Sequence, residues 1–409
     1  MDTNQAKNVV NKFDLQNMNR GRIMQLVYKN PGITRAQISS YTGLTGAAIS
    51  KITNKLIELD LLKSVGRVSG KMGRKAEGLE VNVSEFNVLA IKLSRRELRI
   101  GIFSLSSELI SQKVIDISKL KPDTELVELI SSKILEYVNS DKKIAAVGVA
   151  VPGPFDNEAN KIIGLTDLDS FSEVNLSGLL ELDIDVPVYL IHDANSGVMA
   201  EWLTSEDLYA ENKTIAYYLV GDGVGAGIIS DGKMLLGKNG TAAEVGHISI
   251  NFDGEKCRCG NYGCLELYCS SLQFVRKAEQ LLHKFPNSAL NFIKNFKAQD
   301  IFENAAKGDD LCVSLAKEVA EYMGYGVVNL VNAYAPDEII IGDVMSNGGD
   351  LVLDKIRSVV SERAFNGNEE HVIIRYADKS VDRILLGAAS VAIDNLLRNT
   401  HLLSQIINN

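Results

Sequence analysis

Four residues of types that commonly bind metals, three cysteines and one histidine, lie close together in the sequence. Cys257, Cys259 and Cys264 lie within eight residues, and His247 precedes Cys257 by ten residues. Three thiolates and one imidazole suit tetrahedral zinc, and a site with four protein ligands is closed and structural. The alternative is a disulfide or a cluster of buried thiols, but an intracellular chain with five cysteines rarely concentrates three so tightly. The spacing therefore predicts one structural Zn²⁺ per chain.

Two glutamates flank these predicted zinc ligands. Glu244 lies three residues before His247, and Glu266 lies two residues after Cys264. A bound ion would fix where both carboxylates point, and carboxylates beside an imidazole can hold the hydroxyl groups of a small polar ligand. Because most glutamates are exposed, two surface loop residues are the alternative. The pattern favours a polar-ligand site beside the metal.

This block resembles the ROK family (repressors, open reading frames and sugar kinases). The resemblance rests on the Glu-x-Gly-His step at 244–247, the ten-residue spacing and the Cys-x-Cys-x4-Cys-x-Glu block, and it covers nearly the whole chain after the first 80 residues. It implies an α/β body of the ribonuclease-H-like, actin-like sugar-kinase type with two lobes. It also implies that His247 both binds zinc and faces a sugar.

His192 and Asp193 follow a predicted strand, at the point where a helix is expected to begin. An acid at such a junction can cap the helix or do chemistry, and the cap is the commoner use. Similarity to the family's kinases implies that Asp193 is the position of the base that takes a proton from a sugar hydroxyl. His192 stands where those kinases usually carry asparagine, an exchange associated with the family's repressors. These two residues join Glu244, His247 and Glu266 in the predicted ligand-binding set.

Kinase activity is predicted to be absent, because two parts of the kinases' nucleotide site differ here. Where the kinases have Asp-x-Gly-Gly-Thr after the first strand, the segment Lys92–Arg96 reads Lys-Leu-Ser-Arg-Arg. That segment has no glycine to admit phosphate and no acid to hold magnesium, and phosphoryl transfer depends on both. Further on, Gly342-Asp343 replaces a Gly-Gly pair. We therefore predict that the protein is not an enzyme and that Asp193 is a vestigial base.

Charge is distributed unevenly along the 409 residues, which are 45% hydrophobic and 23% charged, as in ordinary globular proteins. Residues 1–75 contain 13 Lys and Arg against 4 Asp and Glu, a net charge of +9, so the rest carries −18 of the total of −9. A basic head on an acidic body suggests that the head meets a polyanion. The chain lacks an apolar run of membrane-spanning length and a signal-peptide pattern at its N-terminus. We expect a cytoplasmic protein without a membrane partner.

Residues 1–83 predict a winged helix-turn-helix DNA-binding domain. Helices are expected at about 17–28, 34–41 and 45–59, because apolar residues recur at helical spacing and Thr34 begins a capping box. A basic, glycine-rich hairpin follows, placed to touch phosphates or enter the minor groove. Helical triplets also occur in proteins that never bind DNA, and the charge of +9 favours DNA binding. The residues predicted to contact DNA are Arg35, Thr45, Ala47, Ser50, Lys51, Asn54, Arg67, Lys71 and Arg74.

The remaining chain predicts two α/β lobes, 84–200 and 201–409, the second of which carries the zinc ligands. The first lobe is expected to contain strands at 88–93, 98–104, 109–115, 144–151 and 186–191 and a helix at 124–138. The second is expected to contain a hairpin at 214–229, helices to about 332, strands at 338–341 and 372–375, and a closing helix at 383–397. We expect the closing helix to pack on the first lobe.

Together these features predict a sugar-responsive transcriptional regulator, foremost a repressor of carbohydrate-utilisation genes such as those of xylose metabolism. The head resembles that of ROK repressors of the xylose and N-acetylglucosamine type, which the kinases lack. The expected partners are a double-stranded DNA operator, a sugar or sugar phosphate in the interlobe cleft, and further copies in a homodimer or tetramer. Two alternatives stay open: an active sugar kinase with an added head, and a regulator controlled by a protein partner with a vestigial sugar site.

Overall fold

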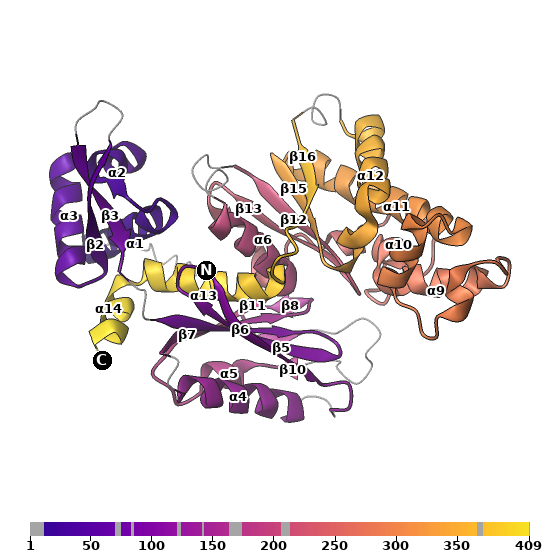
Figure 1. The fold of residues 1–409 in the computed structure, drawn as a ribbon, viewed down its shortest axis with the longest axis horizontal. Coiled ribbons are helices and arrows are strands. Elements are labelled where there is room, and N and C mark those ends of the chain that lie inside the picture. The colour runs from indigo at the N-terminus through magenta and orange to yellow at the C-terminus, as the bar shows by residue number, and fades with distance from the viewer. Residues whose placement is uncertain are drawn as a thin grey trace, which may run out of the picture.

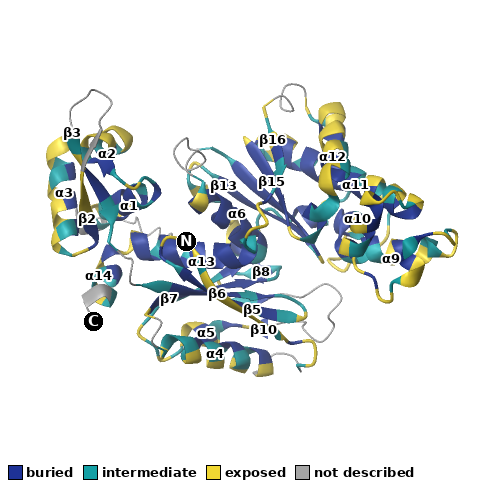
Figure 2. Ribbon diagram, in the orientation of Figure 1, coloured by how far each residue is buried: buried dark blue, intermediate teal, exposed yellow. Residues whose placement is uncertain are grey.

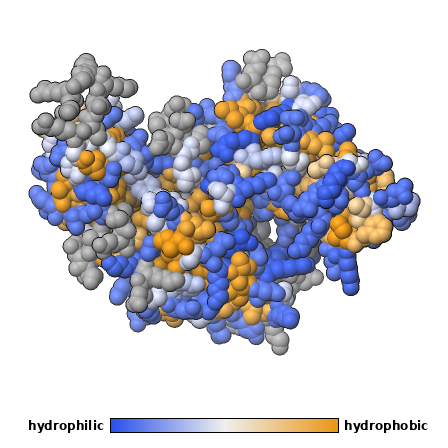
Figure 3. Space-filling view, viewed as in Figure 1, coloured by the Kyte–Doolittle hydropathy of each residue, from blue (hydrophilic) through white to orange (hydrophobic). Residues whose placement is uncertain are grey.

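The structure is a computed structural model that describes residues 12–69, 75–82, 86–120, 124–140, 143–162, 174–205, 213–365 and 371–408. It contains a small N-terminal head and two α/β lobes, each built on a five-stranded sheet (Figure 1). Buried residues, most of them apolar, line the inward sides of the helices and strands (Figure 2), and hydrophilic residues dominate the face seen in Figure 3. Within the described ranges, no helix is both long and apolar enough to cross a membrane.

The head combines three helices with a three-stranded sheet of order β1-β3-β2. Its second helix begins with the predicted capping box, in which Gln37 Oε1 accepts a hydrogen bond from Thr34 N at 2.9 Å and Thr34 Oγ1 accepts one from Gln37 N at 3.3 Å. The third helix buries Ile49 and Leu56 against the head core. The elements are α1 Lys12–Lys29, β1 Ile33–Thr34, α2 Arg35–Thr42, α3 Gly46–Glu58, β2 Leu62–Ser69 and β3 Lys75–Val81.

The first lobe is a mixed sheet of order β11-β7-β4-β5-β6. β4, β5 and β6 form an antiparallel meander, while β7 runs parallel to β4 and β11 parallel to β7. Every residue of β7 is buried, as expected for a strand covered on both faces. The elements are β4 Asn87–Leu93, β5 Glu97–Ser104, β6 Leu109–Asp116, α4 Thr124–Val138, β7 Ile144–Val151, α5 Ser177–Leu180 and β11 Val188–His192. A small separate sheet joins β8 Phe155–Asp156, β9 Lys161–Ile162 and β10 Val174–Asn175.

The second lobe is a sheet of order β14-β13-β12-β15-β16 with helices packed on one face. β12 and β13 form an antiparallel hairpin, and β12, β15 and β16 are parallel. The elements are β12 Ile215–Val220, β13 Val224–Ser230, β14 Lys233–Met234, α8 Glu266–Cys269, α9 Ser271–Leu282, α10 Ala298–Ala306, α11 Asp310–Tyr334, β15 Glu338–Gly342, α12 Gly349–Arg363 and β16 Ile373–Tyr376.

Two helices, α6 Asp193–Thr204 and α13 Arg383–Arg398, lie between the two sheets (Figure 1). α13 packs on β4 and β7 of the first sheet, α6 packs on β12 and β13 of the second, and the helices contact each other. Their backbones meet so closely that a Cβ at Gly387 would lie 1.8 Å from the Ser196 carbonyl oxygen. The interface between the lobes is therefore a pair of helices in close contact. A final helix, α14 Thr400–Asn408, leads from α13 back toward the head.

Most predicted elements are present to within a few residues, including the meander, α4, β7, β15 and α13. α1 begins at Lys12, five residues before the predicted start. The short strand β1 and the helices α12 and α14 were not predicted; α12 buries Val352, Ile356 and Val359, whose spacing is helical. The domain limits at residues 83 and 200 stay a prediction, and residue 200 lies within α6.

Candidate functional site

The predicted zinc ligands come from two short segments of the second lobe. His247 ends the 3₁₀ turn that begins at Val245, and the three cysteines lie on the loop that precedes α8. A hydrogen bond of 3.2 Å from Asn261 Nδ2 to the His247 carbonyl oxygen joins the two segments. The loop therefore folds back onto the turn that carries the imidazole.

The four ligand atoms lie within 4.8 Å of one another. Cys257 Sγ is 3.7 Å from His247 Nδ1, and Cys259 Sγ is 3.6 Å from Cys264 Sγ. Two thiolates on a tetrahedral zinc ion with bonds of about 2.3 Å are separated by roughly 3.8 Å, so this spacing fits one four-coordinate ion. A disulfide requires sulfur atoms about 2.05 Å apart, and these cysteines are free thiols. The donor set therefore fits a metal ion, and the disulfide alternative does not hold.

The residues of the predicted ligand-binding set lie together around Glu244. Burial raises the pKa of the Glu244 carboxyl; the charges of His192 and His247 oppose this rise, and those of Asp193 and Glu266 add to it. Side-chain charges shift one another's pKa in this way only over short distances. The fold thus brings five residues from three separate segments of the sequence to one place.

Glu266 also links the metal loop to the hairpin of the second sheet. The residue is 6% exposed, and its Oε2 accepts a hydrogen bond of 3.0 Å from Val224 N. Val224 begins β13 directly after the glycine-rich turn at 221–223. One carboxylate oxygen of Glu266 therefore holds the backbone of the turn, so the alternative of an exposed loop acid is wrong for this residue.

His192 and Asp193 stand at the start of α6. His192 is the N-cap residue, and Asp193 Oδ1 lies 3.1 Å from His192 Nε2 and accepts a hydrogen bond of 2.7 Å from Ala194 N. A Cβ at Gly153 would lie 2.1 Å from His192 Nε2, so glycine there makes room for the ring. Asp193, the first residue of α6, accepts from the amide of the next residue, which is not the bond of a capping side chain, and its side chain keeps 20% of its surface exposed.

Lys92 begins the segment that differs in sequence from the kinases' phosphate-binding motif. It forms an ion pair within the protein. Its Nζ lies 2.9 Å from Asp382 Oδ2, and Arg99 Nε lies 3.7 Å from the same oxygen. Burial acts to lower the pKa of Lys92, but Asp382 and Asp343 outweigh it and raise that pKa. Asp382 also caps α13, accepting hydrogen bonds of 3.1 Å from Ile384 N and Leu385 N. Asp382 was not singled out from the sequence, although an aspartate before an apolar helix is a cap signal.

Asp343 and Lys92 line the same cavity of about 390 Å³. The Asp343 backbone has φ 64° and ψ −163°, a region adopted almost only by glycine. Asp343 is an exposed residue, although protein atoms partly enclose its carboxyl group. This enclosure raises the pKa of the Asp343 carboxyl, and the charge of Lys92 opposes the rise. A carboxylate is thus held at this position against both backbone strain and desolvation.

Four of the predicted DNA-contacting residues lie on one face of α3. Ala47, Lys51 and Asn54 are exposed there, and Ser50 is half-buried. Thr45 is the N-cap residue of α3, and its side chain accepts a hydrogen bond from Ala48 N. These residues present small or polar groups along one stripe of the helix.

Of the other predicted DNA contacts, Arg35 is hydrogen-bonded within the head, and the side chains of the remaining three are not described by the structure. Arg35 Nε donates to Thr53 Oγ1 at 2.9 Å, its NH2 donates to Asn54 Oδ1 at 3.2 Å, and it forms an ion pair with Glu77. Arg35 thus ties α2 to α3 and to the hairpin. The side chain of Arg67 and the whole of Lys71 and Arg74 lie outside the described residues.

Known proteins resemble this chain in sequence and in fold. Residues 88–395 match the ROK family. The chain belongs to the ROK family. It is similar over 391 residues to the xylose repressor of Caldicellulosiruptor bescii, with 29% identity, and the match covers 94% of this chain and 97% of that protein. The predicted family is therefore confirmed.

Two solved ROK structures share the fold. A ROK family transcriptional regulator, a homolog of the E. coli Mlc protein, superimposes with a TM-score of 0.81 at 24% identity, covering 97% of this chain and all of that one. A ROK family glucokinase from Streptomyces griseus, in complex with glucose and AMPPNP, gives a TM-score of 0.65 at 26% identity, covering 75% of this chain and 98% of the kinase. The predicted sugar-kinase type of body is therefore confirmed for this ROK protein.

Proposed function

We propose that this ROK protein is a sugar-responsive DNA-binding transcriptional repressor. The observation that carries the proposal is how much of the chain each kind of relative covers. The xylose repressor matches 94% of the chain and 97% of its own length, whereas the glucokinase matches 75% of the chain and 98% of its own length. A repressor-like protein therefore accounts for the head as well as the body, and a kinase accounts for a body alone.

The head is proposed to be a winged helix-turn-helix domain. α2 and α3 are joined by a three-residue turn at 43–45, and the β2–β3 hairpin follows α3. The stripe of Ala47, Ser50, Lys51 and Asn54 presents small and polar side chains with which α3 can contact base edges. Arg35 supports that stripe by holding Asn54 and Glu77. The excess of basic residues in the first 75 supplies attraction to phosphates.

The body is proposed to bind a sugar or sugar phosphate between the lobes. Glu244, Glu266, Asp193 and the two histidines gather carboxylates and imidazoles, which accept hydrogen bonds from hydroxyl groups in defined directions. A structural Zn²⁺ held by His247 and the three cysteines would keep the His247 ring and the Glu266 segment in place. Zinc supplies no chemistry in this proposal, because all four of its coordination positions are taken by the protein.

Phosphoryl transfer is not part of the proposal. At the position of the kinases' phosphate loop, Lys92 is already neutralised by Asp382, and Asp343 adds a second carboxylate to the same cavity. The segment 92–96 has no glycine to admit the phosphates of a nucleotide and no acid to hold its magnesium. If the purified protein forms ADP from ATP in proportion to added sugar, the kinase alternative replaces this one.

The proposal is tested by fluorescence anisotropy with labelled DNA from upstream of the protein's own gene. Binding is measured at fixed salt, alone and with each of a panel of free sugars, amino sugars and sugar phosphates. We expect a Kd of about 10⁻⁸ to 10⁻¹¹ M, and one compound that changes it by about 5- to 150-fold.

Failure of each part of the proposal gives a different result. The absence of tight, sequence-dependent binding contradicts the DNA-binding part. Tight binding that no compound changes contradicts the sugar part and makes control by a protein partner the better explanation. The same panel is applied in thermal unfolding, where the effector should raise the melting temperature because it binds only the folded body.

A further inference from the structure

Helix α6 connects the proposed sugar site with the joint between the head and the body. Its first residue is Asp193, and its last turn contains Trp202, Leu203 and Thr204. Its 12 residues span about 18 Å at about 1.5 Å per residue. One rigid element therefore has a proposed ligand-binding residue at one end and lies near the head at the other.

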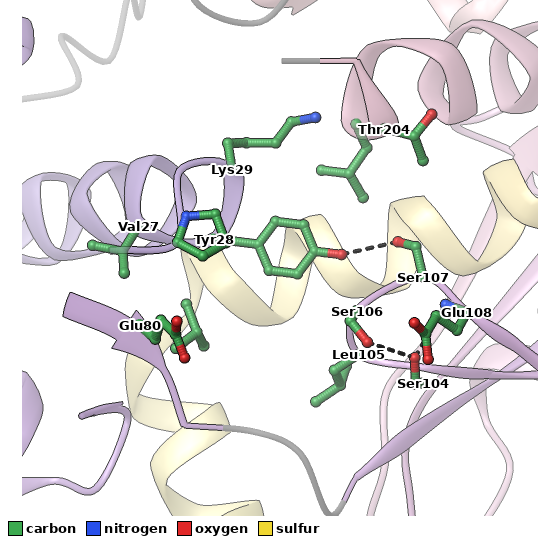
Figure 4. Close-up of a pocket in the computed structure, with 13 residues that line it drawn as sticks. Val27, Tyr28, Lys29, Glu80, Ser104, Leu105, Ser106, Ser107, Glu108 and Thr204 are labelled. Atoms are coloured by element: carbon green, nitrogen blue, oxygen red, sulfur yellow. Dashed lines mark hydrogen bonds between the residues drawn. The ribbon is translucent and has the colours of Figure 1, made fainter. Parts of the chain in front are cut away.

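A cavity of about 590 Å³ lies at this joint. Four parts of the molecule line it: the end of α1 with Tyr28, the end of β3 with Glu80, the β5–β6 turn with Ser107, and the end of α6 with Thr204 (Figure 4). The Tyr28 side chain reaches toward the turn, and its hydroxyl forms a hydrogen bond of 2.9 Å with Ser107 Oγ (Figure 4). The cavity is open to solvent, and its volume leaves room for the surrounding elements to shift.

On its other side, α1 is seated tightly on α13. A Cβ at Gly21 would lie 2.8 Å from the carbonyl oxygen of Arg398, so the two backbones are in contact. Gln25 Nε2 donates a hydrogen bond to Asp394 Oδ1, and Arg398 Nε lies 2.7 Å from Asp394 Oδ2. Apolar residues of α1 share one cluster with residues of α13 and α14. Because α13 packs on β4 and β7, this seam fixes the head to the first lobe.

α6, in contrast, is tied to the second lobe as well as to α13. It packs on β12 and β13, and Glu201 near its end forms ion pairs of 2.9 Å with Arg375 on β16 and 3.0 Å with Arg383 on α13. The Glu201 side chain is 4% exposed, so these pairs are poorly screened by solvent. The cavity therefore lies between a head held by the first lobe and the end of a helix that is tied to both lobes.

We propose that α6 transmits the sugar signal to the head. When a sugar at Asp193 changes the closure of the lobes, the last turn of α6 moves toward or away from Tyr28 across the cavity. The head then turns about the seam of α1 and α13, and the orientation of α3 changes. This route rests on the proposed function, because it explains how sugar binding changes DNA affinity.

The natural sequence provides a reporter for this movement. Trp202 is the chain's single tryptophan and lies in the last turn of α6, 5% exposed. We expect that the compound that changes DNA affinity also changes the intensity or wavelength of Trp202 emission, with the same midpoint concentration. Emission that stays constant while DNA affinity changes overturns the proposal.

Two substitutions test whether the route carries the effect. Thr204→Phe places a large side chain in the cavity from the exposed end of α6, and Gly21→Ala forces the α1–α13 seam to shift. Both should still bind the sugar, within about threefold of the wild-type Kd, but the sugar should change their DNA affinity less than twofold. The wild-type change is the 5- to 150-fold expected above. The control is Ser132→Phe, at an exposed position of α4 far from the joint, which should respond as the wild type does.

The outcomes separate this route from the proposed function. If the wild type shows no sugar effect on DNA binding, the proposed function fails, and the route with it. If the wild type responds and both variants respond equally strongly, only the route is overturned. Far-ultraviolet circular dichroism and sugar binding establish that each variant is folded, so a variant that loses sugar binding also counts against the route.

Discussion

At the residue scale, Asp343 has an unusual backbone conformation. Its φ of 64° with ψ of −163° is a conformation that glycine adopts without strain and other residues adopt at a cost of about 1–3 kcal/mol. Its carboxylate also lies in a cavity whose enclosure raises its pKa. A residue in such a strained conformation points to a role beyond stability, and here the carboxylate lies in the same cavity as Lys92.

Replacing Asp343 with glycine should therefore stabilise the protein. We expect Asp343→Gly to increase the free energy of unfolding by about 1–3 kcal/mol, because it removes the strain and leaves Lys92 paired with Asp382. Equilibrium urea denaturation measures the change. Asp350→Gly, in the first turn of α12, is the control and should be slightly destabilising, since glycine is a poor helix former. A less stable Asp343→Gly protein would show that the carboxylate contributes more than the strain costs.

At the element scale, the segment 248–264 has little regular structure of its own. It contains two isolated β-bridges, Ser249 to Cys264 and Lys256 to Tyr262, between the 3₁₀ turn and α8. A short loop with few ladder hydrogen bonds cannot by itself offset the entropy of ordering its backbone. A metal ion that joins its two ends would supply the missing stabilisation.

Loss of one ligand should therefore release the metal. We expect Cys259→Ser to reduce bound zinc from about one ion per chain to nearly none, measured by inductively coupled plasma mass spectrometry, and to lower the melting temperature. Cys312→Ala is the matched control, since this buried thiol of α11 is not part of the cluster and its loss should leave the zinc content unchanged. Wild-type protein purified without chelators that contains no zinc would refute the assignment.

The second element with a specific prediction is α3. Lys51 is exposed on its proposed DNA-facing stripe. We expect Lys51→Ala to weaken operator binding about tenfold, a loss of about 1.4 kcal/mol, measured by anisotropy at fixed salt. Lys133→Ala removes the same charge from α4 on the body and should change binding less than twofold. If both substitutions weaken binding equally, operator affinity depends only on the overall charge of the protein, and α3 is not the helix that contacts the bases.

At the scale of the whole molecule, the head is attached to the body by packing as well as by the chain connection. α1 rests on α13, α13 rests on the first sheet, and α6 joins the second sheet to the joint. These contacts can couple the binding of a sugar to the binding of DNA only if each ligand binds more tightly to one of two relative positions of the head and the lobes.

Coupling of this kind is reciprocal. If a sugar changes operator affinity by a certain factor, the operator must change sugar affinity by the same factor. We expect sugar titrations followed by Trp202 emission, with and without saturating operator DNA, to give Kd values whose ratio equals that factor within about twofold. If the ratio of the sugar Kd values clearly differs from that factor, the sugar and the DNA act on different oligomeric states. A model with two states of one species would then be wrong.

The sequence by itself determined the features that depend on neighbouring residues. The capping box at Thr34, the strand of β7 and the helical spacing of α3 are local patterns, and their physical causes act within a few residues. The zinc ligands also span only 18 residues, so their types and spacing were enough to predict one cluster, which the structure brings together.

Only the tertiary structure decided the contacts between residues far apart in the chain. Lys92 pairs with Asp382 across 290 residues, and Gln25 meets Asp394 across 369. No periodicity or motif encodes such pairs, because they depend on how whole sheets and helices pack and on which backbones come close enough to touch. The position of α6 between the lobes, and of the cavity at its end, likewise follows from packing alone.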